Sequence, residues 1–196
     1  MRTLADRLKE DTHDLHVAAE RHPVHGALFR GDRPLADFAH LHAQTALVQM
    51  ALEARVGQSA LLRDHVRAHH ARGATMLADA RRLGAEGTPG ETATALIAEI
   101  DRADDATLLG MWYVLEGATN GGRFIAAALA RAHGAFECPS LTPHGPAQGE
   151  RWGAFRAMLD GLSLPDDQQA RVVEGAGRMF RGIIGVLDEV GAARVA

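Results

Sequence analysis

The sequence contains little cysteine, no long apolar run and no excess of positive charge. Its one cysteine, Cys138, cannot form an internal disulfide or supply a thiolate cluster for zinc or iron-sulfur chemistry, which fits a reducing compartment. No histidine partner for it is evident, so we do not expect a catalytic thiol. The net charge of -4 disfavours nucleic-acid binding, because such binding needs basic side chains to neutralise phosphates.

The absence of a long apolar run indicates where in the cell the protein is expected. No stretch of about eighteen apolar residues is free of charges, and the N-terminal MRTLADRLKEDTH is charged where a signal peptide would be apolar. We therefore expect a cytoplasmic protein without a membrane partner. The 196 residues, 46% of them hydrophobic, suffice for one well-formed core, so we expect a single domain over 1–196 that is monomeric.

Apolar residues recur at three- and four-residue spacing along nearly the whole chain, and no sustained apolar/polar alternation indicates strands. The predicted fold class is therefore all-α. A first helix is expected from the capping residue Thr3 to about Glu20, where His22-Pro23 ends it. The segment ECPSLTPHGPAQGE predicts an irregular loop. Further helices are expected at about 24–29, 32–57, 59–71, 73–82, 90–103, 104–134, 148–161 and 165–190.

The predicted helix 104–134 contains YVLEGATNGGRFIAAALARA, with glycines at 117, 121 and 122. Each glycine in a helix interior costs roughly 0.5–1 kcal/mol relative to alanine. One explanation is close packing of helices, since small residues let two backbones approach. The other is a flat, bulky ligand that lies against a strip of bare backbone formed by Gly117, Gly121 and Gly122. A planar ligand would also need an anchor elsewhere in the chain.

A candidate anchor lies in LKEDTHDLHVAAE, from Leu8 to Glu20. His16 is at the border of the apolar face, with Thr12 one turn before it and Glu20 one turn after. Lys9 points in nearly the same direction, about 10 Å away along the axis at 1.5 Å per residue. A neutral imidazole with a cation two turns away suits an iron porphyrin with carboxylate side chains. The alternative is a half-buried histidine and a solvated lysine.

Four segments together resemble the heme oxygenase family, over about 10 to 190. LKEDTHDLHVAAE resembles the proximal helix, in which a lysine, a threonine, the iron-binding histidine and a glutamate occur at these intervals. FAHLHAQTALVQMALEARV is similar to the helix that follows, and YVLEGATNGG to the distal-helix motif. RVVEGAGRMF resembles the last helix of the family.

The resemblance implies that heme b is both substrate and cofactor, held between the first helix and a glycine-kinked distal helix. With O2 and electrons from a ferredoxin, a flavodoxin or a reductase, heme would be cleaved to biliverdin, carbon monoxide and free iron. His16 would bind the iron opposite Gly117, Gly121 and Gly122. The cofactor-binding residues that the resemblance implies are His16, Lys9, Thr12, Glu20, Tyr113 and Arg156.

The chain also departs from the family pattern. Ala118 stands where mammalian relatives have an aspartate that organises water, so Thr119 or Asn120 would take that role. Trp112 stands where they have a tyrosine near the propionates. A heme carrier, or a member that binds heme without degrading it, is therefore an alternative.

Two further groups of residues could hold a metal ion. A non-heme di-iron oxidase needs several inward Glu-x-x-His pairs, and the one pair identified, Glu10 with His13, lies on the polar side of the first helix. The spacing of His65 and His69, with His70 beside them, could hold zinc. No third ligand is identifiable, so we interpret these histidines as a solvated face.

Overall fold

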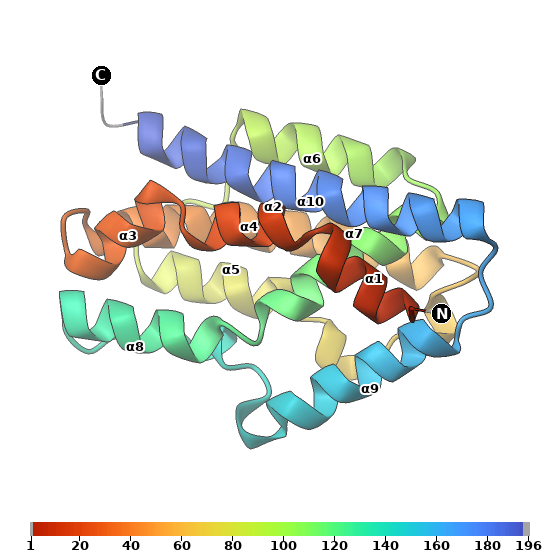
Figure 1. The fold of residues 1–196 in the computed structure, drawn as a ribbon. Coiled ribbons are helices and arrows are strands. Elements are labelled where there is room, and N and C mark those ends of the chain that lie inside the picture. Colours follow the sequence, from red (N-terminus) through yellow and green to blue (C-terminus); the bar gives the residue numbers. More distant parts are fainter. Residues whose placement is uncertain (1, 194–196) are drawn as a thin grey trace.

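The computed structural model describes residues 2–193, in which the chain forms α-helices and short 3-10 turns and no strand (Figure 1). The all-α prediction is confirmed. The α-helices are α1 (Leu4–Asp11), α2 (His13–Glu20), α3 (Pro23–Arg30), α4 (Leu35–Gln58), α5 (Gly73–Arg82), α6 (Glu91–Arg102), α7 (Asp105–Ala118), α8 (Gly122–His133), α9 (Gln148–Gly161) and α10 (Asp166–Ala192). The 3-10 turns are η1 (Arg63–His65), η2 (Ala68–His70), η3 (Pro139–Leu141) and η4 (Gly145–Ala147).

The predicted helix starts are confirmed where a side chain caps them. The Thr3 hydroxyl accepts a hydrogen bond from the backbone N–H of Asp6 at 3.2 Å and opens α1. The Asp104 carboxylate accepts one from the N–H of Thr107 at 2.8 Å and opens α7. Each cap satisfies a backbone donor that the first turn of a helix leaves without a partner.

The expectation of one continuous first helix is wrong, because Thr12 divides it into α1 and α2. The Thr12 side chain is buried, and its hydroxyl donates to the carbonyl of Leu8 at 2.7 Å. A threonine that bonds back to the preceding turn competes with the backbone ladder and bends a helix. Thr12 therefore has a structural role: it sets the angle between the helix that carries Lys9 and the helix that carries His16.

The predicted helix over 59–71 is also wrong. The chain there forms η1 and η2, separated by extended backbone at Val66 and Arg67. The imidazole Nδ1 of His70 accepts the backbone N–H of Arg67 at 3.1 Å, so a side chain takes the place of a helical carbonyl. Local bonds of this kind offer the backbone an alternative to the helix.

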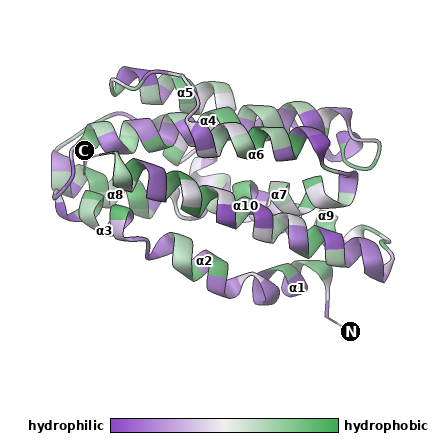
Figure 2. Cartoon of the chain, turned by 90° about the horizontal axis from the view of Figure 1, so that it is seen from above, coloured by the Kyte–Doolittle hydropathy of each residue, from purple (hydrophilic) through white to green (hydrophobic). Residues whose placement is uncertain are grey.

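The helices form three layers in the view of Figure 2: α4, α5 and α6 on one side, α7 and α10 in the middle, and α1 and α2 on the other. Most of α7 is buried. Gly110 of α7 lies against the backbone of Val172 in α10, and Gly175 of α10 against that of Thr107 in α7. The two helices thus pack backbone to backbone. Between residues 2 and 193, no helix is both long and apolar enough to cross a membrane.

The α7–α10 contact gives a stability prediction. A methyl group on Gly110 would overlap the Val172 carbonyl, so Gly110→Ala should lower the free energy of unfolding by about 1–3 kcal/mol or more. Gly153 is the control, because it lies in α9 with nothing within 4 Å of an added methyl group, and Gly153→Ala should stabilise by roughly 0.5–1 kcal/mol. Urea unfolding measures both; equal stability of the two variants would contradict the close approach.

Candidate functional site

The predicted helix 104–134 is interrupted at its glycines. Helix α7 ends at Ala118 and α8 begins at Gly122, with a turn between them. The expectation of one continuous helix is therefore wrong, and the helix-interior cost of the glycines largely disappears. Gly117 lies in the last turn of α7, and Gly122 is the first residue of α8. Gly121 is the N-cap of α8, a position where glycine costs little.

Side chains hold the α7–α8 turn in place. The Thr119 hydroxyl donates to the Glu116 carbonyl at 2.7 Å, and the Asn120 amide donates to the Gly117 carbonyl at 3.0 Å. Gln148, at the start of α9, donates to Thr119 Oγ1 at 2.8 Å and to Asn120 Oδ1 at 3.0 Å. No sequence motif points to Gln148, because it is 28 residues from Asn120.

The three glycines have different surroundings. A methyl group on Gly122 would overlap the Leu141 carbonyl of η3, so close packing of backbones explains this glycine. At Gly117 an added methyl group would meet only Trp152, at an ordinary 3.5 Å, and at Gly121 only the Ala118 carbonyl at 3.6 Å. Gly117 and Gly121 therefore form the bare backbone surface, and Gly122 is part of its support.

His16 lies on α2 with an exposed side chain. Its ring meets the ring of Phe180 in α10 edge to face, with centroids 5.9 Å apart. Its Nδ1 is 3.8 Å from the carboxylate of Glu20, one turn later. Lys9 on α1 is exposed and makes no ion pair within residues 2–193. The imidazole and the ammonium group are thus both available to a ligand.

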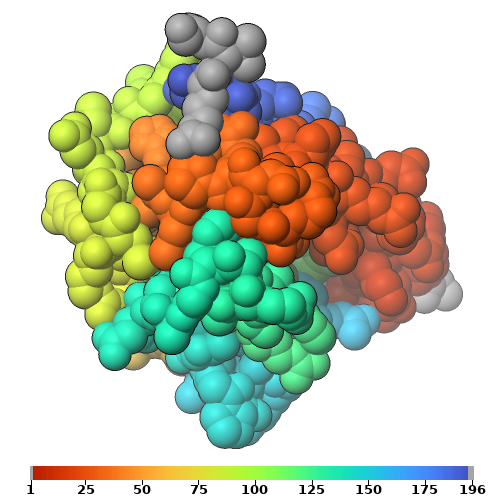
Figure 3. All heavy atoms as spheres, turned by 90° about the vertical axis from the view of Figure 1, so that its left-hand side faces the viewer, coloured from red at the N-terminus to blue at the C-terminus, as the bar shows by residue number. Residues whose placement is uncertain are grey.

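Two helices connect the His16 side to the glycine side. Helix α10 carries Phe180 against His16 and also packs along α7. Helix α9 contacts α1, since Arg156 pairs with Asp6 at 3.0 Å, and it contacts α7, since the rings of Trp152 and Tyr113 lie 5.6 Å apart. Figure 3 shows α8 and α9, in teal and cyan, below the red and orange N-terminal helices. Burial raises the pKa of Tyr113, so its phenol stays neutral.

A buried ion pair supports the end of α7. The guanidinium of Arg72 donates to the Glu116 carboxylate at 2.6 Å and to the Leu115 carbonyl at 3.1 Å. Trp112 donates its indole N–H to the same carboxylate at 3.2 Å, so this residue faces the interior. Burial raises the pKa of Glu116, and the charge of Arg72 opposes that rise. The last turn of α7, just before Gly117, is therefore held by charge-assisted hydrogen bonds.

The interpretation of the histidine cluster as a solvated face is wrong for His70. This side chain is buried, with its ring edge to face on Trp112 at a centroid distance of 4.9 Å. Burial lowers the pKa of His70 to about 3, so its imidazole is neutral. His70 packs beneath α7 and is a structural residue.

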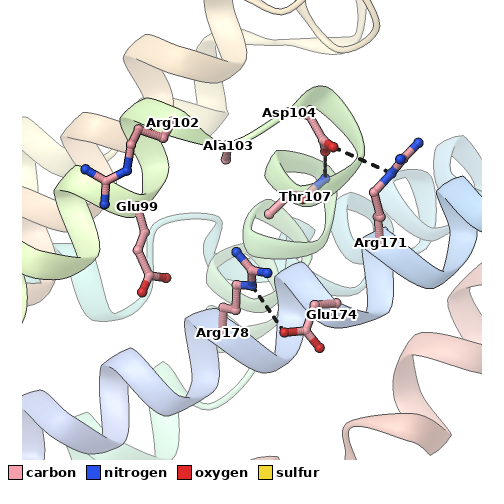
Figure 4. Close-up of a pocket in the computed structure, with 8 residues that line it drawn as sticks. All are labelled: Glu99, Arg102, Ala103, Asp104, Thr107, Arg171, Glu174 and Arg178. Atoms are coloured by element: carbon pink, nitrogen blue, oxygen red, sulfur yellow. Dashed lines mark hydrogen bonds and ion pairs between the residues drawn. The ribbon is translucent and has the colours of Figure 1, made fainter.

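A pocket of about 490 Å³ lies elsewhere, between α6, α7 and α10 (Figure 4). Its lining is mostly charged, with Arg171 3.5 Å from Asp104 and Arg178 3.2 Å from Glu174. It contains no histidine and none of the residues expected to bind heme or to act in catalysis. Its paired charges and lack of an axial ligand distinguish it from a porphyrin site.

In the described part of the chain, the side chains do not form the di-iron site that was the other metal hypothesis. Glu10 and His13 are exposed, and within residues 2–193 no carboxylate-rich cluster of the di-iron kind is present. The one compact group of three possible ligands in that range joins His42, Asp79 and Cys138. Cys138 therefore does have a histidine neighbour, contrary to the expectation from sequence, because His42 approaches it from 96 residues away.

Comparison with known proteins gives consistent results. A family model described as heme oxygenase matches residues 2–189. The heme oxygenase of Leptospira interrogans has a TM-score of 0.84 at 19% identity, over 96% of this chain and 100% of that one. Heme oxygenase-1 of the cyanobacterium Synechocystis, in complex with heme, has a TM-score of 0.84 at 15% identity, over 96% of this chain and 92% of that one. The NO- and CO-bound heme oxygenase of Neisseria meningitidis has a TM-score of 0.73 at 23% identity, over 100% of this chain and 96% of that one. No curated protein matches the chain in sequence.

The buried pair Arg72–Glu116 gives a prediction about stability. Arg72→Met leaves a buried carboxylate without its partner, which should cost about 3–5 kcal/mol, whereas Arg72→Met with Glu116→Leu should recover most of the loss. In Arg72→Met the pKa of Glu116 rises further. The folded state then binds this proton more tightly than the unfolded state does. The loss of unfolding free energy relative to the parent protein should therefore shrink as the pH falls toward the pKa of Glu116 in the unfolded chain. Urea unfolding at several pH values measures this; a pH-independent deficit would argue against it.

Proposed function

The chain belongs to the heme oxygenase family, and we propose that it cleaves heme to biliverdin, carbon monoxide and free iron with O2 and external electrons. The observation that carries the proposal is that α10 packs against both α2, which carries His16, and α7, which leads into the Gly117–Gly121 surface. Helix α9 joins α7 to α1, the helix before α2. Bound heme supplies an iron that binds and activates O2. The electron donor would be a ferredoxin, a flavodoxin or a reductase, and we propose that the protein acts as a cytoplasmic monomer.

The proximal residues fit an iron ligand. His16 presents an exposed imidazole, and the edge of its ring is steadied by Phe180. The Glu20 carboxylate, 3.8 Å from Nδ1, favours the proton on that nitrogen and leaves Nε2 as the ligand atom. Lys9 is free to pair with a propionate. Arg156 is the second candidate for a propionate, but it already shares its charge with Asp6.

The residues of the distal turn leave space for a ligand, because two of them are glycines that carry no side chain. Gly117 and Gly121 leave room beside the α7–α8 turn, and Ala118 adds no proton donor there. Thr119 uses its one hydroxyl proton, and Asn120 one of its two amide N–H groups, on a carbonyl of the turn. We therefore propose that protons arrive through ordered water, which the acceptor oxygens of Thr119 and Asn120 help to position. Gln148 fixes both of these oxygens.

The same distal residues favour one alternative. A chain whose distal turn has no acidic side chain to supply protons could bind heme without degrading it, as a carrier does. Turnover separates the two functions: with ferredoxin and a reductase, a heme oxygenase converts the heme absorption into that of biliverdin and releases carbon monoxide, whereas a carrier leaves the heme intact.

The proximal assignment predicts the behaviour of His16→Ala. Hemin added to the parent protein should give a sharp Soret band, and His16→Ala should shift and weaken that band and lose most of the turnover. Added imidazole should restore the band, because it can fill the space of the missing ligand. His13→Ala is the matched control, since His13 is exposed on the same helix and should be dispensable. Identical spectra for His16→Ala and the parent would refute the assignment.

The distal assignment predicts a difference between neighbouring glycines. Gly121 has a φ of -82°, and an added methyl group would meet only the Ala118 carbonyl at an ordinary distance. Gly121→Leu should therefore fold yet bind heme at least about tenfold more weakly, because the side chain would occupy the ligand's place. Gly122→Ala should instead lower the thermal midpoint, since its methyl group meets the Leu141 carbonyl. Heme titration and thermal unfolding measure the pair; full heme affinity and turnover in Gly121→Leu would count against a heme-facing strip.

A further inference from the structure

Three side chains from distant parts of the chain converge beside η3. His42 comes from α4, Asp79 from α5, and Cys138 is the residue just before η3. One ligand atom from each lies within 4.8 Å of the others, and His42 Nε2 is 3.8 Å from Cys138 Sγ. His42 and Asp79 are buried, with 7% and 1% of their surface exposed. Three buried or half-buried groups that can each bind a metal ion are thus held at ligand spacing.

The surrounding contacts orient these groups. The Asp79 carboxylate accepts the backbone N–H of Ser140 at 2.8 Å and pairs with Arg82. The His42 ring stacks on Phe38 at a centroid distance of 5.3 Å. Outer contacts of this kind fix the orientation of metal ligands. A carboxylate has about four lone-pair sites, so Asp79 can keep both partners and still bind a cation.

We propose that His42, Asp79 and Cys138 bind one zinc ion. A mixed nitrogen, oxygen and sulfur set is typical of zinc, whereas magnesium and calcium prefer oxygen alone. A tetrahedral ion would keep a fourth position, which the Ser140 hydroxyl or a water can fill: this hydroxyl lies 2.8 Å from His42 Nε2 and 3.7 Å from Cys138 Sγ. When the Zn–S bond forms, the Cys138 thiol releases its proton to solvent.

The chemical state of the ligands agrees with this site. Burial lowers the pKa of His42 to about 4, so its imidazole is neutral and can donate a lone pair. Burial also raises the pKa of the Cys138 thiol to about 11, so without a cation the group is an inert thiol and not a nucleophile. A bound cation reverses this preference, because it stabilises the thiolate directly.

The ion would link η3 to α4 and α5. The carbonyl of Leu141, the last residue of η3, packs against Gly122 at the start of α8. Zinc at this site would therefore stabilise η3, the segment against which the start of α8 packs. The site uses none of the residues proposed to bind heme, so its test needs no heme.

Cobalt(II) is the probe, added to the full chain after a chelator has removed metals. Because Cys138 is the only cysteine, thiolate-to-cobalt absorption in the near ultraviolet can arise only from this residue. We expect the band to saturate at one cobalt per chain and to disappear when zinc replaces cobalt. Cys138→Ser should abolish the band, and His42→Gln should weaken binding by about tenfold or more.

His40→Gln is the matched control, because His40 is exposed on the same helix, and it should bind cobalt like the parent. Zinc should also raise the thermal midpoint of the parent but not of Cys138→Ser. The absence of the thiolate band in the folded parent protein would overturn the proposal, as would unchanged cobalt affinity in His42→Gln. Neither result bears on heme binding, which His16→Ala tests separately.

Discussion

The position of α7 depends on a contact between two backbones. Gly110 and Gly175 let α7 and α10 approach without side chains between them, and this places most of α7 in the core. At its other end, the buried pair of Arg72 and Glu116 holds the last turn. Such a pair adds little net stability, since desolvation opposes the attraction, but losing one partner is costly. Helix α7 therefore ends at one defined place, Ala118, directly after the buried turn that carries Glu116.

The break after Ala118 follows from what packs around the turn. Leu141 occupies the space that a side chain at position 122 would need, and Gln148 bonds to the side chains of Thr119 and Asn120. Inside the turn, the backbone N–H groups of residues 119 to 122 donate to carbonyls three residues earlier, and these bonds replace the helical hydrogen bonds that the break removes. The bare backbone at Gly117 and Gly121 is thus a supported turn, and the sequence cost of its glycines is smaller than a continuous helix would imply.

Local signals explain which parts of the fold could be predicted from sequence. Capping at Thr3 and Asp104 acts over three residues, and the apolar period acts over a few turns, so the helices that depend on them were predicted. Contacts between distant residues carry no such signal: Arg72 meets Glu116 across 44 positions and His42 meets Cys138 across 96. The bend at Thr12 and the turn at His70 were missed because a side chain there replaces a backbone partner. The roles of His16 and Lys9 rest on the family resemblance, and their exposure is compatible with it.

The two sides of the candidate heme site are held with different strength. Ten of the fourteen residues of α7 are buried, whereas α2 has no buried residue. Opening free energies are lowest where few apolar contacts are lost, so displacing α2 costs less than displacing α7. The turn that carries the glycines is bonded on both sides. This contrast favours ligand entry by movement of α2, with the distal surface as the fixed wall. A ligand bound to His16 would then stabilise α2 by tying it to the rest of the fold.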